Sequence, residues 1–190
     1  MPVKTIKIVI AGPYGAGKTT FVKTLSEVLP IDTEAPITKG LMDNKKSTTV
    51  AFDYGRMKVR EDLVVHLFGI PGQERFSFMW KIIARGMHGY LFIVDSSSEE
   101  RVKEALGMYN FFRENFPSTP HIIAANKQDI PTAVDTFTIK NILKAPYEVK
   151  VMPLIATNRR SALFVLVTLL EEIKNYLVEM TKYSNEEIQQ

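Results

Sequence analysis

A glycine-rich segment near the start of the chain constrains the fold more than any other feature. Residues Gly12 to Thr19 read GPYGAGKT and fit the pattern G-x-x-x-x-G-K-[ST] at every fixed position. The segment follows an apolar run, IKIVIA, and precedes an amphipathic stretch, so it predicts a strand, a tight loop and a helix. Backbone N–H groups of such a loop and of the helix N-terminus can wrap a diphosphate. We therefore predict a phosphate-binding loop.

The residues of this loop have separate expected roles. Its glycines permit close approach to a phosphate, Lys18 places a positive charge on the terminal phosphates, and Thr19 is a candidate Mg²⁺ ligand. The bulky Tyr14 would shield the terminal phosphate or crowd an incoming group. The residues expected to bind the phosphates are Gly12, Tyr14, Gly15, Ala16, Gly17, Lys18, Thr19 and Thr20. The alternative is a glycine-rich turn that fits the pattern by chance.

The rest of the chain alternates apolar runs with segments of helical periodicity. The apolar runs predict buried strands at 6–11, 89–95, 121–126 and 149–156. The helical patterns predict helices at 19–29, 99–116, 136–144 and 161–180. A hairpin is expected from 48–59 and 63–68, and a long, functional loop from 31–47. This order predicts an α/β fold with a doubly wound, mostly parallel sheet and one antiparallel edge strand, in a single domain over 1–180 with a polar, frayed tail at 181–190.

Composition argues against several other classes of protein. The chain has 24 Lys plus Arg and 21 Asp plus Glu, a net charge of +3 without a basic stripe, so we expect no nucleic-acid partner. Cys is absent, which excludes disulfides, thiolate metal sites, a Cys nucleophile and lipid anchors on Cys. Residue 2 is Pro rather than Gly, so N-myristoylation is not expected either. With no signal peptide or membrane-spanning run, the expected location is the cytoplasm.

A second motif follows a predicted strand. Residues Asn126 to Asp129 read NKQD, about a hundred residues after the glycine-rich loop. The Asp129 carboxylate can accept hydrogen bonds from guanine N1–H and from its 2-amino group, whereas adenine offers neither donor. Asn126 would reach guanine N7 or tie this loop to Gly15, and the stem of Lys127 would cover the base. The alternative is a turn that Asp129 caps ahead of Pro131.

With these two motifs in this order, the chain resembles a small Ras-like GTPase from about Lys4 to Met180. The resemblance implies a G-domain that binds GTP or GDP with Mg²⁺. It also implies a Thr in a first switch segment that binds Mg²⁺ and contacts the γ-phosphate. Thr49 matches that position, with Thr48 as the alternative, so Thr19 and Thr49 are the expected metal ligands.

The second switch segment of the family corresponds to FGIPGQERF in this chain. The resemblance implies that Gly72 donates its N–H to the γ-phosphate, that Gln73 orients the attacking water, and that Lys18 neutralises charge. Gly69 stands where the family has an Asp that supports a Mg²⁺-bound water, and Pro71 replaces the common Ala. A PGQ segment without the Asp is similar to the prokaryotic gliding-motility (MglA) branch and related bacterial and archaeal small GTPases, the branch we favour.

The last family motif matches poorly, because Ile155 to Asn158 read IATN. Its main role is a backbone N–H to guanine O6, for which Thr157 is the candidate, and Ala156 next to it is also expected to bind the nucleotide. The implied reaction is slow hydrolysis of GTP to GDP and phosphate. An arginine finger would come from a partner or in cis, and the candidates in cis are Arg56, Arg60, Arg75 and Arg85.

The resemblance also implies partners for a molecular switch. We expect a regulatory protein that accelerates hydrolysis, such as a roadblock-type protein, and an effector that contacts the switch segments; the chain itself is expected to be a monomer. The aromatic and apolar residues that would contact an effector, or alternatively belong to the core, are Phe52, Tyr54, Phe76, Phe78, Met79 and Trp80.

Two alternative functions remain at this point. The first is a scaffold that binds GTP without useful hydrolysis, which Tyr14, Gly69 and the lack of an obvious arginine finger favour. The second is an ATP-using P-loop protein such as a small kinase. The NKQD segment and the lack of an obvious acceptor-binding insertion argue against the second.

Overall fold

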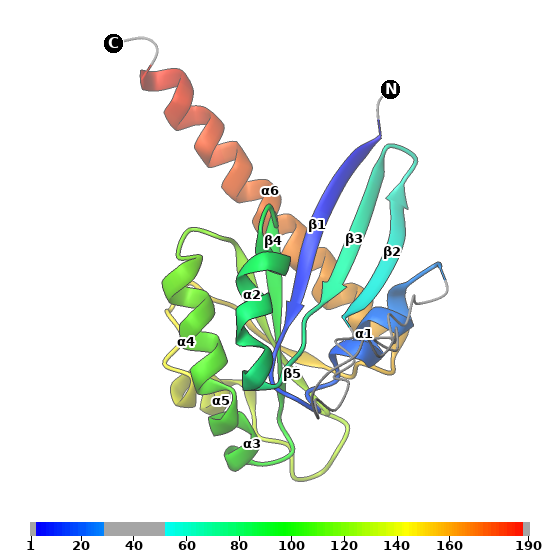
Figure 1. Cartoon of the computed structure of the whole chain (residues 1–190), viewed down its shortest axis with the longest axis vertical. Coiled ribbons are helices and arrows are strands. Elements are labelled where there is room, and N and C mark those ends of the chain that lie inside the picture. Colours follow the sequence, from blue (N-terminus) through cyan, green and yellow to red (C-terminus); the bar gives the residue numbers. More distant parts are fainter. Residues whose placement is uncertain (1–2, 29–51, 188–190) are drawn as a thin grey trace, which may run out of the picture.

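The computed structural model describes residues 3–28 and 52–187, and it places a six-stranded sheet between two layers of helices (Figure 1). The strand order across the sheet is β2-β3-β1-β4-β5-β6. The strands are β1 (Lys4–Ala11), β2 (Asp53–Arg60), β3 (Leu63–Gly69), β4 (Gly89–Asp95), β5 (His121–Asn126) and β6 (Val151–Leu154). All neighbours pair in parallel except β2 and β3, which form an antiparallel hairpin at one edge. The predicted fold class is therefore confirmed.

Alternate side chains of the central strands enter two separate cores. The helices are α1 (Lys18–Leu25), α2 (Ser77–Ala84), α3 (Glu99–Glu104), α4 (Leu106–Asn115), α5 (Thr136–Ile142) and α6 (Arg159–Glu187). Ile8 and Ile10 of β1 pack in the core under α1 and α6, whereas Val9 packs in the core under α2 to α5. Burial on both faces explains why these strands read as continuous apolar runs. In Figure 1, α6 continues well beyond the edge of the sheet.

The motif-bearing loops all leave the same edge of the sheet. The five mutually parallel strands β3, β1, β4, β5 and β6 point their carboxyl ends that way. The glycine-rich loop follows β1, the second switch segment follows β3, and the NKQD segment begins at the end of β5. Doubly wound sheets bind ligands at this edge, so the topology brings these distant segments together.

The helix boundaries differ from the expected ones in several places. The first helix ends at Leu25 rather than at residue 29, because Ser26 has an extended backbone with ψ 134°. The expected helix 99–116 is two helices, since the Ala105 N–H bonds to the carbonyl three residues back, at Val102. Helix α2 was not anticipated at all. The last helix continues to Glu187, seven residues beyond its expected end at Met180.

The last strand is shorter than predicted, spanning Val151–Leu154, and the expected loop 31–47 lies outside the described residues. Within 3–28 and 52–187, no helix is long and apolar enough to cross a lipid bilayer.

Candidate functional site

The glycine-rich loop passes close to two neighbouring strands, and its glycines make this approach feasible. Gly12 has φ +143°, and a Cβ there would lie 2.1 Å from the Ile93 carbonyl oxygen of β4. Gly17 has φ +104°, and a Cβ there would lie 2.2 Å from Asn126 Nδ2. Both backbone conformations are ones that L side chains rarely adopt. A side chain at either position would push the loop away from the sheet edge.

Lys18 lies at the centre of this loop with its side chain almost fully buried. Its Nζ donates hydrogen bonds to the carbonyl oxygens of Gly12, at 2.8 Å, and Pro13, at 2.7 Å. Burial lowers the pKa of Lys18 to about 8, and the Asp53 carboxylate acts in the opposite direction. The loop therefore holds an ammonium group that an incoming phosphate would stabilise in its charged form.

We expect the affinity for a nucleoside diphosphate to decrease as the pH rises above about 8, because Lys18 must take up a proton to bind. The decrease approaches tenfold per pH unit until the higher pKa of the bound state is reached. The same lowered pKa affects the stability of the nucleotide-free chain. Below pH 8 the charged, buried Lys18 destabilises the fold in full, and this destabilisation decreases as the pH rises towards 10.5.

Calorimetric titration of the chain with nucleotide, in two buffers of different ionisation enthalpy, measures the proton uptake on binding directly. We predict an uptake near zero at pH 6.5 that rises towards about one proton above pH 8. No uptake above pH 8 would contradict the prediction.

Asn126 joins the glycine-rich loop to two other loops. Its Nδ2 donates to the Ala16 carbonyl oxygen at 2.8 Å, and its Oδ1 accepts from the Ala156 N–H at 2.9 Å. The carbonyl of Ala156 in turn accepts from Thr24 Oγ1 of α1 at 2.8 Å. The side chain of Asn126 is buried, so neither of its bonds competes with bulk water. One residue thereby fixes the relative positions of three predicted nucleotide-binding segments.

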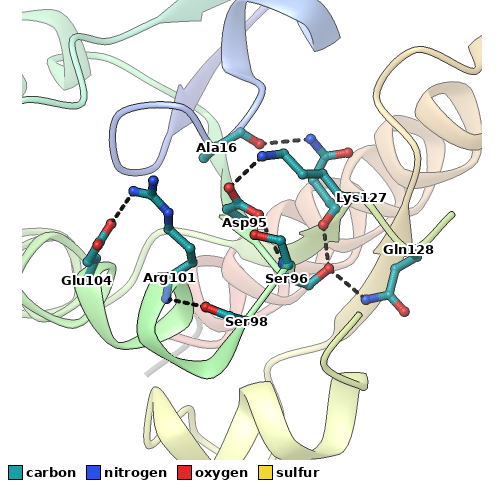
Figure 2. A network of polar contacts seen from close by, with 10 residues as sticks. Ala16, Asp95, Ser96, Ser98, Arg101, Glu104, Lys127 and Gln128 are labelled. Atoms are coloured by element: carbon teal, nitrogen blue, oxygen red, sulfur yellow. Dashed lines mark hydrogen bonds and ion pairs between the residues drawn. The ribbon is translucent and has the colours of Figure 1, made fainter. Parts of the chain in front are cut away.

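Lys127 and Gln128 are held by residues at the end of β4 (Figure 2). Lys127, with φ +70°, places Nζ 2.5 Å from Asp95 Oδ2. Gln128 Nε2 donates to Ser96 Oγ at 2.8 Å, and Ser96 Oγ donates to the Asn126 carbonyl oxygen. Burial raises the pKa of Asp95, but hydrogen bonds from Lys127 and the Ser97 backbone outweigh it and hold that pKa below its usual value. Asp95 is therefore a carboxylate that keeps Lys127 in place.

Asp129, in contrast, is exposed at the rim of this loop. Its neighbours are fixed by the Gln128 bonds and by a turn in which the Ile130 N–H donates to the Lys127 carbonyl oxygen. The loop after β6 lies alongside, because Ala156 bonds to Asn126, and Thr157 is exposed next to it. The structure thus brings together the predicted base-reading residues Asn126, Asp129, Ala156 and Thr157.

The second switch segment packs directly against the glycine-rich loop. A Cβ on Gly72 would lie 2.5 Å from the Tyr14 backbone nitrogen and 2.6 Å from Lys18 Nζ. The segment is fixed from behind by Trp80 of α2, whose Nε1 donates to the Pro71 carbonyl oxygen at 2.8 Å. Only glycine at position 72 allows this close approach.

A cavity of about 610 Å³ opens between these segments. It is lined by residues of the glycine-rich loop, of β2 and of the second switch segment. Those that the sequence predicted as site residues are Tyr14, Gly15, Gly17, Lys18, Thr19, Thr20, Gly72 and Gln73. The two others in the loop, Gly12 and Ala16, are buried.

Thr19 and Asp53 provide oxygen atoms that fit a magnesium ion. Thr19 Oγ1 donates to Asp53 Oδ2 at 2.6 Å, at the wall of this cavity. Mg²⁺ prefers hard oxygen ligands and takes one or two carboxylates together with phosphate oxygens. In the part of the chain that the structure describes, no group of three or more His, Cys, Asp or Glu could hold a metal. An ion here would therefore depend on the phosphates of a ligand. The other expected metal ligand, Thr49, lies outside the described residues.

Of the four arginines considered as an arginine finger in cis, the structure places only one at the cavity. Arg75 lines the cavity, with its guanidinium carbon 4.8 Å from the centre of the Phe76 ring. Arg60 instead lines a different groove, between the hairpin and α6. Arg56 and Arg85 are exposed, and neither lines the cavity.

The aromatic and apolar residues expected on an effector surface differ in exposure and fall into three groups. Trp80 is 5% exposed and belongs to the core beneath α2, whereas Phe78 is 64% exposed on the same helix. Tyr54 is half-buried and shares a hydrogen bond of 2.8 Å between its hydroxyl and His66 Nδ1. Phe52, Phe76 and Met79 are also half-buried.

Sequence reasoning missed two carboxylates of the site, Asp53 and Asp95. Asp95 directly follows the apolar run of β4, which is the position where the other motifs follow their strands, so its place at a strand end was the available signal. The sequence gives no such signal for Asp53, because its position beside Thr19 depends on how β2 pairs with β3.

Fold and site together define a P-loop protein with the small-GTPase fold. The family described as conserved hypothetical ATP binding protein matches residues 10–184, so the chain belongs to that family. An uncharacterized protein of Methanocaldococcus jannaschii is 30% identical over 145 residues, covering 76% of this chain and 84% of that protein. ADP-ribosylation factor-related protein 1 of Rattus norvegicus is 29% identical over 135 residues, or 70% of this chain, and the match spans 64% of the rat protein.

A solved structure supports the assignment of the fold. The Arl6 BBS3 small GTPase of Trypanosoma brucei, with the bound nucleotide analogue GppNp, superposes with a TM-score of 0.67 at 16% identity. The superposition covers 91% of this chain and 99% of that one. The similarity to ADP-ribosylation factor relatives and to this structure identifies the chain's fold as Arl/Arf-related.

Proposed function

We propose that this chain binds guanine nucleotides and switches between GTP and GDP states, with slow intrinsic hydrolysis of GTP. The proposal depends mainly on one observation. Two buried hydrogen bonds of the Asn126 side chain join the phosphate-binding loop to the loop after β6. Because Asp129 follows three residues later in the same loop, a nucleotide whose phosphates lie against Lys18 would place its base at Asp129.

The description of the chain's family names ATP, so the choice of base needs its own argument. The Asp129 carboxylate would accept from guanine N1–H and the 2-amino group, whereas the N1 lone pair of adenine would face it unfavourably. The Ala156 N–H is already bonded to Asn126, which leaves the Thr157 N–H as the candidate donor to guanine O6. Three complementary contacts favour guanine, and an adenine nucleotide remains the second candidate because of the family description.

For hydrolysis, the chain would contribute positioning and charge stabilisation. Lys18 would bind the terminal phosphates, and the N–H of Gly72, which lies beside Lys18, would bind the γ-phosphate. Gln73, which lines this cavity, would orient the attacking water. Thr19 and Thr49 would hold Mg²⁺, which when bound neutralises charge on the phosphate oxygens. Arg75 is the arginine in cis that the geometry favours.

Replacing Gln73 with Leu is expected to slow single-turnover release of phosphate by about 10²-fold, since the water loses its orientation. The measurement uses purified chain loaded with GTP, with and without a roadblock-type protein. The affinity for GDP serves as the control and should stay unchanged. If the wild type were no faster than the variant under either condition, the chain would be a GTP-binding scaffold without useful hydrolysis.

We further propose how the chain is regulated. Binding and release of the γ-phosphate would change the position of the second switch segment, and the exposed Phe78 on α2 would be part of the surface that an effector contacts. The PGQ segment without an Asp at position 69 supports the MglA-related prokaryotic branch and a roadblock-type regulator. A monomeric protein of the cytoplasm, with its G-domain over residues 1–180, fits this role.

A further inference from the structure

Asp53 occupies the space that a side chain at position 69 would need. Asp53 and Gly69 are direct partners in the antiparallel pairing of β2 and β3. A Cβ on Gly69 would lie 2.9 Å from Asp53 Oδ2 and 3.0 Å from Asp53 Cβ. Position 69 has no positive φ that would itself require glycine. A side chain at position 69 would therefore meet the side chain of Asp53, and Asp53 would have to move to make room for it.

The same carboxylate faces the phosphate-binding loop. Its Oδ2 accepts the hydrogen bond from Thr19 Oγ1 at 2.6 Å, and its charge raises the pKa of Lys18 against the effect of burial. A carboxylate has about four acceptor positions, so the bond from Thr19 leaves capacity for a cation or for water bound to it. The Thr19 hydroxyl oxygen can still donate a lone pair to a metal while its proton is directed to Asp53.

We propose that Asp53 supports the Mg²⁺ of the bound nucleotide, directly or through a water ligand, in place of an acidic residue at position 69. This inference rests on the proposed nucleotide binding. The acid would then stand on the facing residue of β2 instead of at the end of β3, so the site keeps one carboxylate next to Thr19 although position 69 has none. We therefore expect Mg²⁺ to retain the nucleotide strongly, despite Gly69.

The test is the dissociation rate of fluorescent GDP from the full chain, measured in excess Mg²⁺ and in EDTA. Asp53→Asn keeps the size of the side chain and an oxygen that accepts from Thr19, but it removes the charge. Loss of a supporting carboxylate weakens metal binding by about 10–100-fold, and the slowing by Mg²⁺ should shrink accordingly. The rate in EDTA should stay close to that of the wild type. Asp62→Asn, in the turn of the same hairpin, is the matched control and should behave as the wild type.

A relocated carboxylate provides an independent check. The double variant Asp53→Gly with Gly69→Asp returns the acid to β3 and removes both close contacts of the Asp53 side chain, so it should recover the effect of Mg²⁺ that Asp53→Ala alone loses. Gly69→Asp alone forces two carboxylates into contact and should lower the thermal unfolding temperature. If the folded double variant showed no more effect of Mg²⁺ than Asp53→Ala, the exchange of roles between the two strands would be wrong.

The outcomes separate this inference from the proposed function. Tight GDP binding with the same Mg²⁺ effect in the wild type and in Asp53→Asn overturns only the role of Asp53. Tight ADP binding instead of GDP overturns the choice of base, and the same comparison with fluorescent ADP then decides on Asp53, since Mg²⁺ contacts the phosphates. Absence of binding of either nucleotide to folded chain overturns both.

Discussion

Replacing Asp129 with Asn is expected to lower the affinity for GDP by about 10⁴-fold, because a site built on paired hydrogen bonds rejects a mismatched partner strongly. The carboxylate accepts from both N1–H and the 2-amino group of guanine, whereas the amide of the variant accepts only one and directs a donor at the other. Asp129 is exposed and its side chain holds no packing of the loop, so the fold should be unaffected. Equilibrium titration with fluorescent GDP measures the effect.

Xanthosine diphosphate is the matched control for this variant. Xanthine has a carbonyl where guanine has the 2-amino group, so it would accept from the amide of the variant and be repelled by the carboxylate of the wild type. The variant should therefore bind xanthosine diphosphate better than GDP. Unchanged GDP affinity in the variant would mean that Asp129 belongs to a turn and does not read the base.

The second large effect is expected on replacing Asn126 with Ala. The change removes two buried hydrogen bonds and leaves the Ala16 carbonyl and the Ala156 N–H without this partner. We expect the free energy of unfolding to fall by about 2–5 kcal/mol, since each lost bond and each stranded buried group contributes on the order of 1–3 kcal/mol. Affinity for the nucleotide should fall as well, because the phosphate-binding loop loses its fixed distance from the base-reading loop.

Urea denaturation of the nucleotide-free chain measures this loss of stability. Asn110→Ala, at an exposed position of α4, is the control and should change the free energy of unfolding by less than about 0.5 kcal/mol. A similarly small change for Asn126→Ala would show that the two bonds do not hold the loops together.

The architecture and much of the candidate site could be predicted from the sequence, because they depend on local patterns. Buried parallel strands read as apolar runs, and their carboxyl ends converge whatever the side chains are. For this reason the segments around Lys18, Gly72 and Asn126 could be expected to meet. The partners that Asn126 holds, the carbonyl of Ala16 and the N–H of Ala156, came only from the structure.

Features that depend on pairing across strands could not be predicted. Whether Asp53 faces Gly69 is set by the residue-by-residue pairing of β2 with β3, and one residue of slip would turn the carboxylate to the other side of the sheet. The length of α6 was missed for a different reason. A polar composition after Met180 indicates exposure, but a helix already formed extends by one hydrogen bond for each residue added.

The central claim is that this chain, from a family described as ATP-binding, selects guanine nucleotides. The most direct test is titration of purified, nucleotide-stripped chain with fluorescent GDP and fluorescent ADP, each in the presence and absence of Mg²⁺. Tight binding of GDP, strengthened by Mg²⁺, with negligible binding of ADP is the predicted result. Equal binding of both nucleotides, or preference for ADP, would contradict the claim and leave only a phosphate-binding loop on this fold.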